Sequence, residues 1–513
     1  MILKRLILGI LFLIVFGVNS AEASCLWVGN TGTASALTPE SIQSCVNDIT
    51  SAFTGEVNII IPPGIQTWAT RVRIDMTDVS NPAPNFTNVT KLNILGVGVD
   101  LTTIMDGLPS HGYEVALFSI NMAPGKVIRI RGMTIDGNDA STTNGMIYIN
   151  GNNGGQTFRV DHMKFLNYGS GRGIKINGYT YGLVDNNIFI GGGHSVDTFG
   201  DGSASWLRPA ALGTSNAVYI ENNTFDFSVS GMSDGVIDGY NSARYVFRYN
   251  QVMGTNIGHH GNDSGNYRSV HTFEIYNNSF TNTSSKDIFA WGNIRGGTGV
   301  IFNNVISAGT KTYNKFVYLH NYRSCPYFEG THNGGNGSAF LADSTANFST
   351  GPQGALANGH YVYNLTAGSY CRITSHTDSG PATAVCTLAG GTRQVWNNGD
   401  VYGTHYIQND ALLCTGLSTA DGNTGYQGYP CQDQIGRTTN QVLDPLYQWG
   451  NNYLGSTTPT MSNGNSCARE LQHIQSGTDY VDNGTTPKPG YSPYTYPHPL
   501  SAPAPVRNLR IAQ

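Results

Sequence analysis

The segment from Asp234 to Arg268 brings together side chains that could do acid–base chemistry. Elimination of a glycosidic oxygen from a uronate needs a cation for the sugar carboxylate, a base for the C5 proton and an acid for the leaving oxygen. We expect His260 to be the base or the acid, Arg268 to hold the carboxylate, and Asp238 to orient His260. Lys175 is a reserve base. Structural alternatives stay open, because Asp-Gly at Asp238 is typical of a turn and an exposed arginine is often only solvated.

Further polar and aromatic residues are candidates for substrate binding. They are Trp291, His320, Tyr148, His259, Asp263 and Asp234. Trp291 could stack on a sugar ring or could belong to the core. Asp238 and Asp234 could instead be calcium ligands, because hard carboxylate oxygens suit that ion. Asp263 with Glu274 would form an acid pair for hydrolysis, although the position of Glu274 in a strand favours a structural role.

These candidates lie in or beside short strands in which aliphatic and polar residues alternate. The aliphatic residues expected to point inward are Ile120, Ile149, Ile176, Ile237 and Leu319. The outward row is then Asn121, Asn150, Asn177, Asp238, His260, Trp291 and His320, beside a second row with Tyr148, Lys175 and Tyr318. Adjacent strands lie about 4.8 Å apart, so Asp238 and His260 would be within hydrogen-bond reach. A register shift of one residue would turn His259 outward in place of His260.

The strands belong to a repeat marked by one asparagine. Asn187, Asn223, Asn250, Asn278 and Asn304 each precede an apolar pair, at separations of 26 to 36 residues. This period, with strands too short to bury a face alone, indicates a solenoid whose coils cover one another. Asparagine tolerates the left-handed backbone of a tight bend, and stacked asparagines can hydrogen-bond from coil to coil. We therefore expect a structural ladder.

Two long segments interrupt the repeat on one side, residues 191–215 and 254–269. Loops long enough to wall a groove are usually functional.

The predicted helix near Pro39, the start VNIIIPPG and coils ending in x-N-N-x-F resemble the pectate-lyase-like superfamily. The resemblance covers about residues 36–325. It implies an all-β fold, a right-handed single-stranded parallel β-helix with an N-terminal capping helix. The superfamily includes lyases, hydrolases, epimerases and phage tailspikes, so the resemblance implies carbohydrate chemistry or binding.

The motifs of two catalytic subfamilies do not match. The vWIDH strand and the RxPxxR motif of pectate lyases are absent, and of the polygalacturonase motifs only His260-Gly261 and RGIKI at Arg172 occur, in reversed order. No catalytic residue is carried over. The leading hypothesis is a pectate-lyase-like polysaccharide lyase that acts on an acidic glycan, with calcium as a candidate cofactor. The alternatives are an inverting glycoside hydrolase and a non-catalytic glycan-binding adhesin.

Composition shifts divide the chain into five parts. Residues 1–23 read as a secretory signal peptide, 24–336 as the β-helix, 337–405 as a small β-hairpin module, 406–500 as an irregular cap rich in Tyr, Pro and Gly, and 501–513 as a linker. We therefore expect a secreted or cell-surface protein. No second apolar stretch reaches the roughly 20 residues needed for a membrane span.

The net charge is −5 and only 12% of residues are charged, with no basic stripe, so nucleic acid is not an expected partner. A polysaccharide is the expected partner, and the chain is expected to be a monomer. The eight cysteines in an oxidising compartment favour disulfides. Proximity suggests the pairs Cys25–Cys45, Cys371–Cys386 and Cys414–Cys431, which leaves Cys325 and Cys467, but many other pairings are compatible with the sequence.

Overall fold

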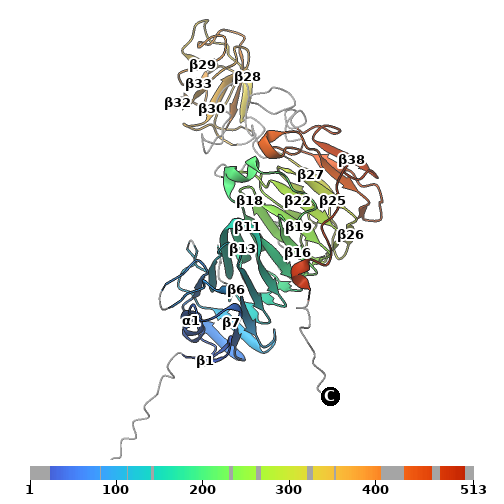
Figure 1. Cartoon of the computed structure of the whole chain (residues 1–513). Coiled ribbons are helices and arrows are strands. Elements are labelled where there is room, and N and C mark those ends of the chain that lie inside the picture. Colours follow the sequence, from blue (N-terminus) through green and yellow to red (C-terminus); the bar gives the residue numbers. More distant parts are fainter. Residues whose placement is uncertain are drawn as a thin grey trace, which may run out of the picture.

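The computed structural model describes residues 24–80, 83–112, 114–139, 144–229, 235–261, 267–320, 327–351, 354–405, 433–464 and 474–502. The chain is built mostly from strands, which stack from the N-terminal end upward in Figure 1. The expected all-β class is therefore confirmed.

The N-terminal helix α1 (Pro39–Asn47) forms where the sequence predicts it. The Thr38 side chain accepts a hydrogen bond from the Ser41 backbone N–H, and Pro39 occupies the first turn. The buried face of the helix includes Ile42 and Cys45. A disulfide joins Cys45 to Cys25, so the helix is fixed to the first strand.

The strands of the stack are divided among three sheets, in which they pair in parallel with the corresponding strands of the next repeat. The largest sheet contains β1 (Cys25–Val28), β2 (Thr31–Ala34), β3 (Gly55–Ile61), β5 (Val72–Asp75), β6 (Val89–Gly96), β8 (Phe118–Asn121), β9 (Val127–Arg131), β11 (Ile147–Asp161), β13 (Arg172–Asp185), β15 (His194–Phe199), β16 (Val218–Glu221), β18 (Ile237–Tyr240), β19 (Arg244–Arg248), β22 (Thr272–Tyr276), β25 (Thr298–Phe302), β35 (Leu446–Trp449) and β38 (Tyr480–Gly484). The exception to parallel pairing in this sheet is β1 with β2.

Two further sheets are parallel throughout. The longer contains β4 (Gly64–Trp68), β7 (Thr102–Asp106), β10 (Thr134–Asp136), β12 (Lys164–Leu166), β14 (Ile188–Ile190), β17 (Thr224–Asp226), β20 (Gln251–Met253), β23 (Ser279–Asn282), β26 (Val305–Ala308) and β36 (Asn452–Tyr453). The shorter contains β21 (Ile257–Gly258), β24 (Gly292–Ile294), β27 (Val317–Leu319) and β37 (Met461–Asn463). The aliphatic residues of these sheets share one continuous core.

The asparagine ladder is confirmed. The Asn278 amide nitrogen donates to the Asn304 Oδ1 at 2.9 Å, and the Asn250 amide donates to Asn278 in the same way at 3.1 Å. Asn451 extends the row beyond the repeats recognised in the sequence. The left-handed backbone lies one residue earlier than expected, for example at Asn277 (φ 56°), while the ladder asparagine itself is buried. One residue therefore makes the bend, and the asparagine after it makes the ladder hydrogen bonds.

A small antiparallel unit follows the stack. One sheet contains β28 (Phe328–Thr331), β30 (Tyr361–Asn364), β31 (Ser369–Arg372) and β34 (Val401–His405), and the other β29 (Phe340–Asp343), β32 (Ser375–Thr377) and β33 (Ala382–Val385). The unit has its own core and the disulfide Cys371–Cys386. Because β28 pairs with β34, the unit begins before residue 337.

The C-terminal part contains regular strands, whereas the sequence suggested an irregular cap over residues 406–500. Strand β35 pairs in parallel with β25, so the chain returns to the stack after the antiparallel unit. Residues 490–502 then run back along the outer face of the largest sheet and end beside β16, in red in Figure 1. The described residues also include the short 3-10 helices η1 (Gly202–Leu207), η4 (Thr439–Gln441) and η5 (Pro499–Ser501).

Two expected features fall outside the described residues. The predicted pair Cys414–Cys431 lies there, as do Cys325 and Cys467. In the part of the chain that the structure describes, no helix is long and apolar enough to cross a membrane.

Candidate functional site

Four neighbouring strands place polar side chains in one row. The parallel register aligns Tyr148 of β11 with Lys175 of β13, Lys175 with Asp197 of β15, and Asp197 with Asp238 of β18. Asp238 therefore belongs to the row of Tyr148 and Lys175, and not to the asparagine row in which we expected it. The asparagine row continues through Phe199 and Tyr240 instead.

The difference arises from β15, which lies inside a segment predicted to be a loop. Its sequence HSVDTF alternates, and Val196 points into the core. This alternation was the available signal, but the neighbouring glycines and the long spacing to the next ladder asparagine obscured it. The extra strand brings His194 and Asp197 into the site, and sequence reasoning missed both.

Asp238 and His260 make the predicted contact. The His260 Nδ1 lies 2.6 Å from the Asp238 Oδ1. The imidazole is one-third exposed, whereas the carboxylate is 4% exposed. The backbone N–H of His260 donates to the carbonyl of Gly239 at 2.9 Å, which fixes the ring beside β18. A partly exposed imidazole backed by a buried carboxylate is an arrangement suited to proton transfer.

The second carboxylate oxygen of Asp238 faces a histidine and an arginine. The His194 Nε2 and an Arg172 guanidinium nitrogen each lie 3.8 Å from it. Burial opposes ionisation of Asp238, but the hydrogen bond from His260 and the charges of these groups hold its pKa well below the ordinary value. Asp238 therefore remains a carboxylate.

Asp197 has the opposite tendency. Burial raises its pKa, and the neighbouring charge of Asp238 adds to the effect, although Lys175 and Arg172 oppose it. The Lys175 Nζ lies 3.8 Å from the Asp197 carboxylate, and Arg172 forms an ion pair with the same oxygen. Two carboxyl groups on adjacent strands thus have pKa values displaced in opposite directions, a pattern typical of acid–base sites.

Three aromatic rings lie next to these charged groups. Phe199 is 4.8 Å from Tyr240 and 5.0 Å from Tyr267, between ring centroids. The Tyr240 ring is 5.6 Å from that of His260, and Tyr267 is partly exposed. Phe199 and Tyr240 lie two residues after Asp197 and Asp238, so strand alternation places them on the same side. This spacing could have identified them from the sequence.

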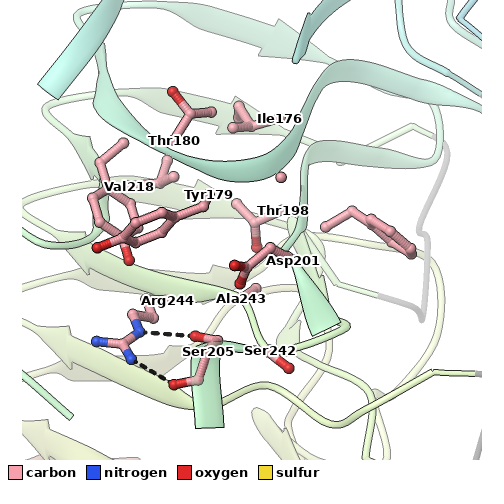
Figure 2. Close-up of a pocket in the computed structure, with 14 residues that line it drawn as sticks. Ile176, Tyr179, Thr180, Thr198, Asp201, Ser205, Val218, Ser242, Ala243 and Arg244 are labelled. Atoms are coloured by element: carbon pink, nitrogen blue, oxygen red, sulfur yellow. Dashed lines mark hydrogen bonds between the residues drawn. The ribbon is translucent and has the colours of Figure 1, made fainter. Parts of the chain in front are cut away.

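A pocket adjoins Phe199 on the side of the segment that follows β15 (Figure 2). Arg244 points toward Ser205 and donates to its hydroxyl at 3.2 Å and to its carbonyl at 3.0 Å. The guanidinium thus fixes η1 against β19. Asp201, which also lines this pocket, forms an ion pair with Arg208 at 2.6 Å.

Arg268 is held by contacts within the protein. Its guanidinium forms two hydrogen bonds with the Asp433 carboxylate, at 2.5 and 2.6 Å, and is largely buried beside Trp206. A buried arginine needs a paired carboxylate, and Asp433 comes from the distant C-terminal segment. The expectation of an available clamp at Arg268 is therefore corrected.

Trp291 and His259 point into the interior. Trp291 is fully buried and stacks on Phe316 at 5.2 Å, because the outward position of β24 is Asn293. His259 lies 3.1 Å from the Tyr245 hydroxyl, and burial lowers the pKa of its imidazole to about 3. Neither side chain can contact a glycan in this arrangement, so both binding assignments are corrected.

The other predicted binding residues are dispersed. His320 directly follows β27, in the sheet that contains β24. It contacts the Asn293 side chain at 2.9 Å, and burial lowers the pKa of its imidazole to about 3. Tyr148 is in the row described above but is almost fully buried. Glu274 lies on the outer face and accepts from the Tyr491 hydroxyl at 2.5 Å. Asp234 and Asp263 lie outside the described residues.

Calcium fits the surroundings of Asp238 poorly. Its oxygens face His260, His194 and Arg172, all of which are or can become positive. Across the described ranges, no group of three His, Cys, Asp or Glu side chains could hold a metal ion. The calcium assignment stays a prediction, since its other ligand, Asp234, is not described.

Comparisons with known proteins add little to this geometry. No family model matches the chain, and no curated protein does. Among solved structures the chain is similar to ORF18 of Geobacillus virus E2, with 11% identity over 70% of this chain and 74% of that one and a TM-score of 0.18. A likeness this weak carries no argument about fold or function.

Proposed function

We propose that the chain is an exported polysaccharide lyase that cleaves an acidic glycan by β-elimination. In this proposal the stacked sheets form a right-handed parallel β-helix, and the row of Lys175, Asp197 and Asp238 lies along the substrate groove. The apolar leader and the two disulfides support export. One chain supplies all of these groups, so we propose that a monomer is active.

The observation that carries the proposal is the His260–Asp238 pair. With Nδ1 held by the carboxylate, Nε2 is the nitrogen that can take the C5 proton of a uronate. The negative charge of Asp238 stabilises the imidazolium that forms. His260 is thus the proposed base, and Asp238 is its positioning residue.

Positive charge for the uronate carboxylate comes from Arg172 and Lys175 in place of Arg268. Their side chains are 21% and 12% exposed. Both approach Asp197, and Arg172 also lies 3.8 Å from Asp238. Tyr240 is the proposed acid for the leaving oxygen. Burial raises the pKa of its hydroxyl, so the proton is retained until the glycosidic bond breaks.

A panel of uronate polysaccharides incubated with the full chain, with and without a chelator, tests the reaction class. The proposal expects products with the ultraviolet absorbance of an unsaturated uronate. Loss of activity with chelator would support a metal requirement. Tight binding without any cleavage would instead indicate a glycan-binding adhesin.

The paired carboxyl groups favour one second candidate, a glycoside hydrolase. Asp197 would hold the proton for the leaving oxygen and Asp238 would activate water. The full burial of the Asp197 side chain weighs against it, because the acid must reach the glycosidic oxygen. New reducing ends without unsaturated products would identify this reaction.

A further inference from the structure

The outer face of the largest sheet changes character along the stack. In its C-terminal half the outward residues include Tyr219, Tyr276 and Phe302, which cluster with the aromatic residues of the returning segment 490–502. In its N-terminal half the outward residues include several arginines, and the register aligns Arg129 of β9 with Arg159 of β11. The returning segment thus covers the aromatic half.

The described part of the covering segment reaches the boundary between the two halves. Arg159 donates to the carbonyl of Leu500 at 2.9 Å, and the described chain ends at Ala502. Beyond this point lies a recess of about 560 Å³. Its lining, which we call the basic recess, includes Glu56, Lys91, Arg129, Arg131, Arg159, His162 and residues 499–502.

Positive groups outnumber carboxylates around the recess. Asp161 is fully buried and is approached by three guanidiniums, those of Arg129 at 2.6 Å, Arg131 at 3.6 Å and Arg159 at 3.5 Å. His162 contacts the same carboxylate at 2.7 Å. One negative charge therefore faces several positive ones.

The remaining carboxylates do not remove the excess. Arg159 also pairs with buried Asp185 at 2.7 Å, and Lys91 pairs with exposed Glu56 at 3.1 Å. Four cations, Lys91, Arg129, Arg131 and Arg159, thus share three carboxylates, and the two buried ones are Asp161 and Asp185. Arg131 contacts Asp161 at the longer distance of 3.6 Å and has 44% of its side chain exposed.

We propose that the basic recess binds a carboxylate or sulfate group of an acidic polysaccharide, at a second site apart from the His260 groove. Guanidinium groups bind such oxyanions through paired hydrogen bonds, and the buried carboxylates hold the arginines in place for this. The site would tether a polymer to the enzyme without taking part in cleavage. The choice of an acidic polysaccharide as the ligand rests on the proposed function, whereas the oxyanion site itself does not require the reaction at His260.

Calorimetry on the full chain tests the site, with oligouronates and sulfated oligosaccharides as separate probes and carboxyl-reduced neutral oligomers as the control. The His260→Ala substitution prevents turnover during the titration. Arg131→Glu is expected to weaken binding about tenfold or more, because one charge-assisted contact contributes about 1.5 to 3 kcal/mol. The probe that binds more tightly shows whether the recess prefers a carboxylate or a sulfate group.

A matched lysine pair provides the control. Lys91→Glu changes a residue of the recess, whereas Lys311→Glu changes an exposed lysine outside it. Weaker binding by the Lys91 variant alone supports the site. Equal binding by wild type and Arg131→Glu, equal binding of the neutral oligomers, or no binding of either acidic probe would overturn it. Binding at the recess with no cleavage by the wild type would leave this site intact and remove the proposed lyase.

Discussion

The Nδ1 atom of His260 lies 2.6 Å from the Oδ1 atom of Asp238, although 22 residues separate them in the chain. The contact joins Asp238 in β18 to the segment that follows β21. Because the carboxylate is buried and the imidazole is partly exposed, the pair can orient one ring nitrogen toward a bound chain.

Replacing Asp238 with asparagine should lower turnover by about 10²-fold or more, in the range of acid–base contributions. The amide cannot stabilise the imidazolium that forms when His260 takes a proton, so the loss should appear in kcat while KM changes little. The control is Asp100→Asn, at an exposed carboxylate. An unchanged kcat in Asp238→Asn would refute the positioning role.

The same carboxylate should make stability depend on pH. Its pKa is lowered in the folded chain, so its contribution is present above the ordinary value of 3.8 and is lost as the pH falls through the lowered pKa. Asp238→Asn should therefore destabilise the protein at neutral pH and much less at low pH. Denaturant unfolding of both proteins at several pH values checks this, and a constant difference would contradict it.

His259 should make the folded protein less stable in acid, because its burial disfavours the protonated imidazole. Burial lowers its pKa to about 3, below the ordinary 6.5, so the folded state loses stability as the pH falls below 6.5. His259→Gln should reduce this loss by up to about 1.4 kcal/mol per pH unit. The half-exposed His162 gives a control variant, His162→Gln. Identical acid sensitivity of the His259 variant and wild type would show that His259 is not the group responsible.

Neighbouring asparagines separate the ladder from the bend. Asn278→Ala removes a buried side chain that donates to the carbonyl of Phe247 and to Asn304, and should cost about 2 to 3 kcal/mol of unfolding free energy. Asn277→Gly should cost much less, because glycine readily adopts the positive φ found there. Equal costs in denaturant titrations would mean that the ladder bonds contribute little.

Arg268 should prove to be structural. Arg268→Ala leaves Asp433 buried without its partner and should cost about 3 to 5 kcal/mol, while Arg268→Leu with Asp433→Leu should recover much of that loss. Unfolding free energies and KM of both variants decide the point. A raised KM with unchanged stability would restore the clamp that the sequence suggested.

The repeat and the His260 register could be predicted from the sequence because both follow from local patterns. The asparagines recur in similar short contexts, and alternation from Ile257 correctly turns His260 outward and His259 inward. Trp291 was misplaced because it precedes the strand β24, which begins at Gly292. A shift of one position is enough to exchange the two faces.

The rest of the site depended on contacts that local patterns do not reveal. Asp197 lies in a strand flanked by glycines, so its place beside Asp238 follows only from the parallel register of β15 and β18. The partner of Arg268 is 165 residues away in the sequence. A buried charge announces that a partner exists but does not identify it.

The most direct measurement of the central claim is chemical rescue of His260→Gly on a uronate polysaccharide that the wild type cleaves. Removing the imidazole should lower the rate of unsaturated-product formation by about 10²- to 10⁴-fold, and free imidazole in solution should restore part of it. A wild-type rate in His260→Gly without imidazole would contradict the assignment of His260 as the base.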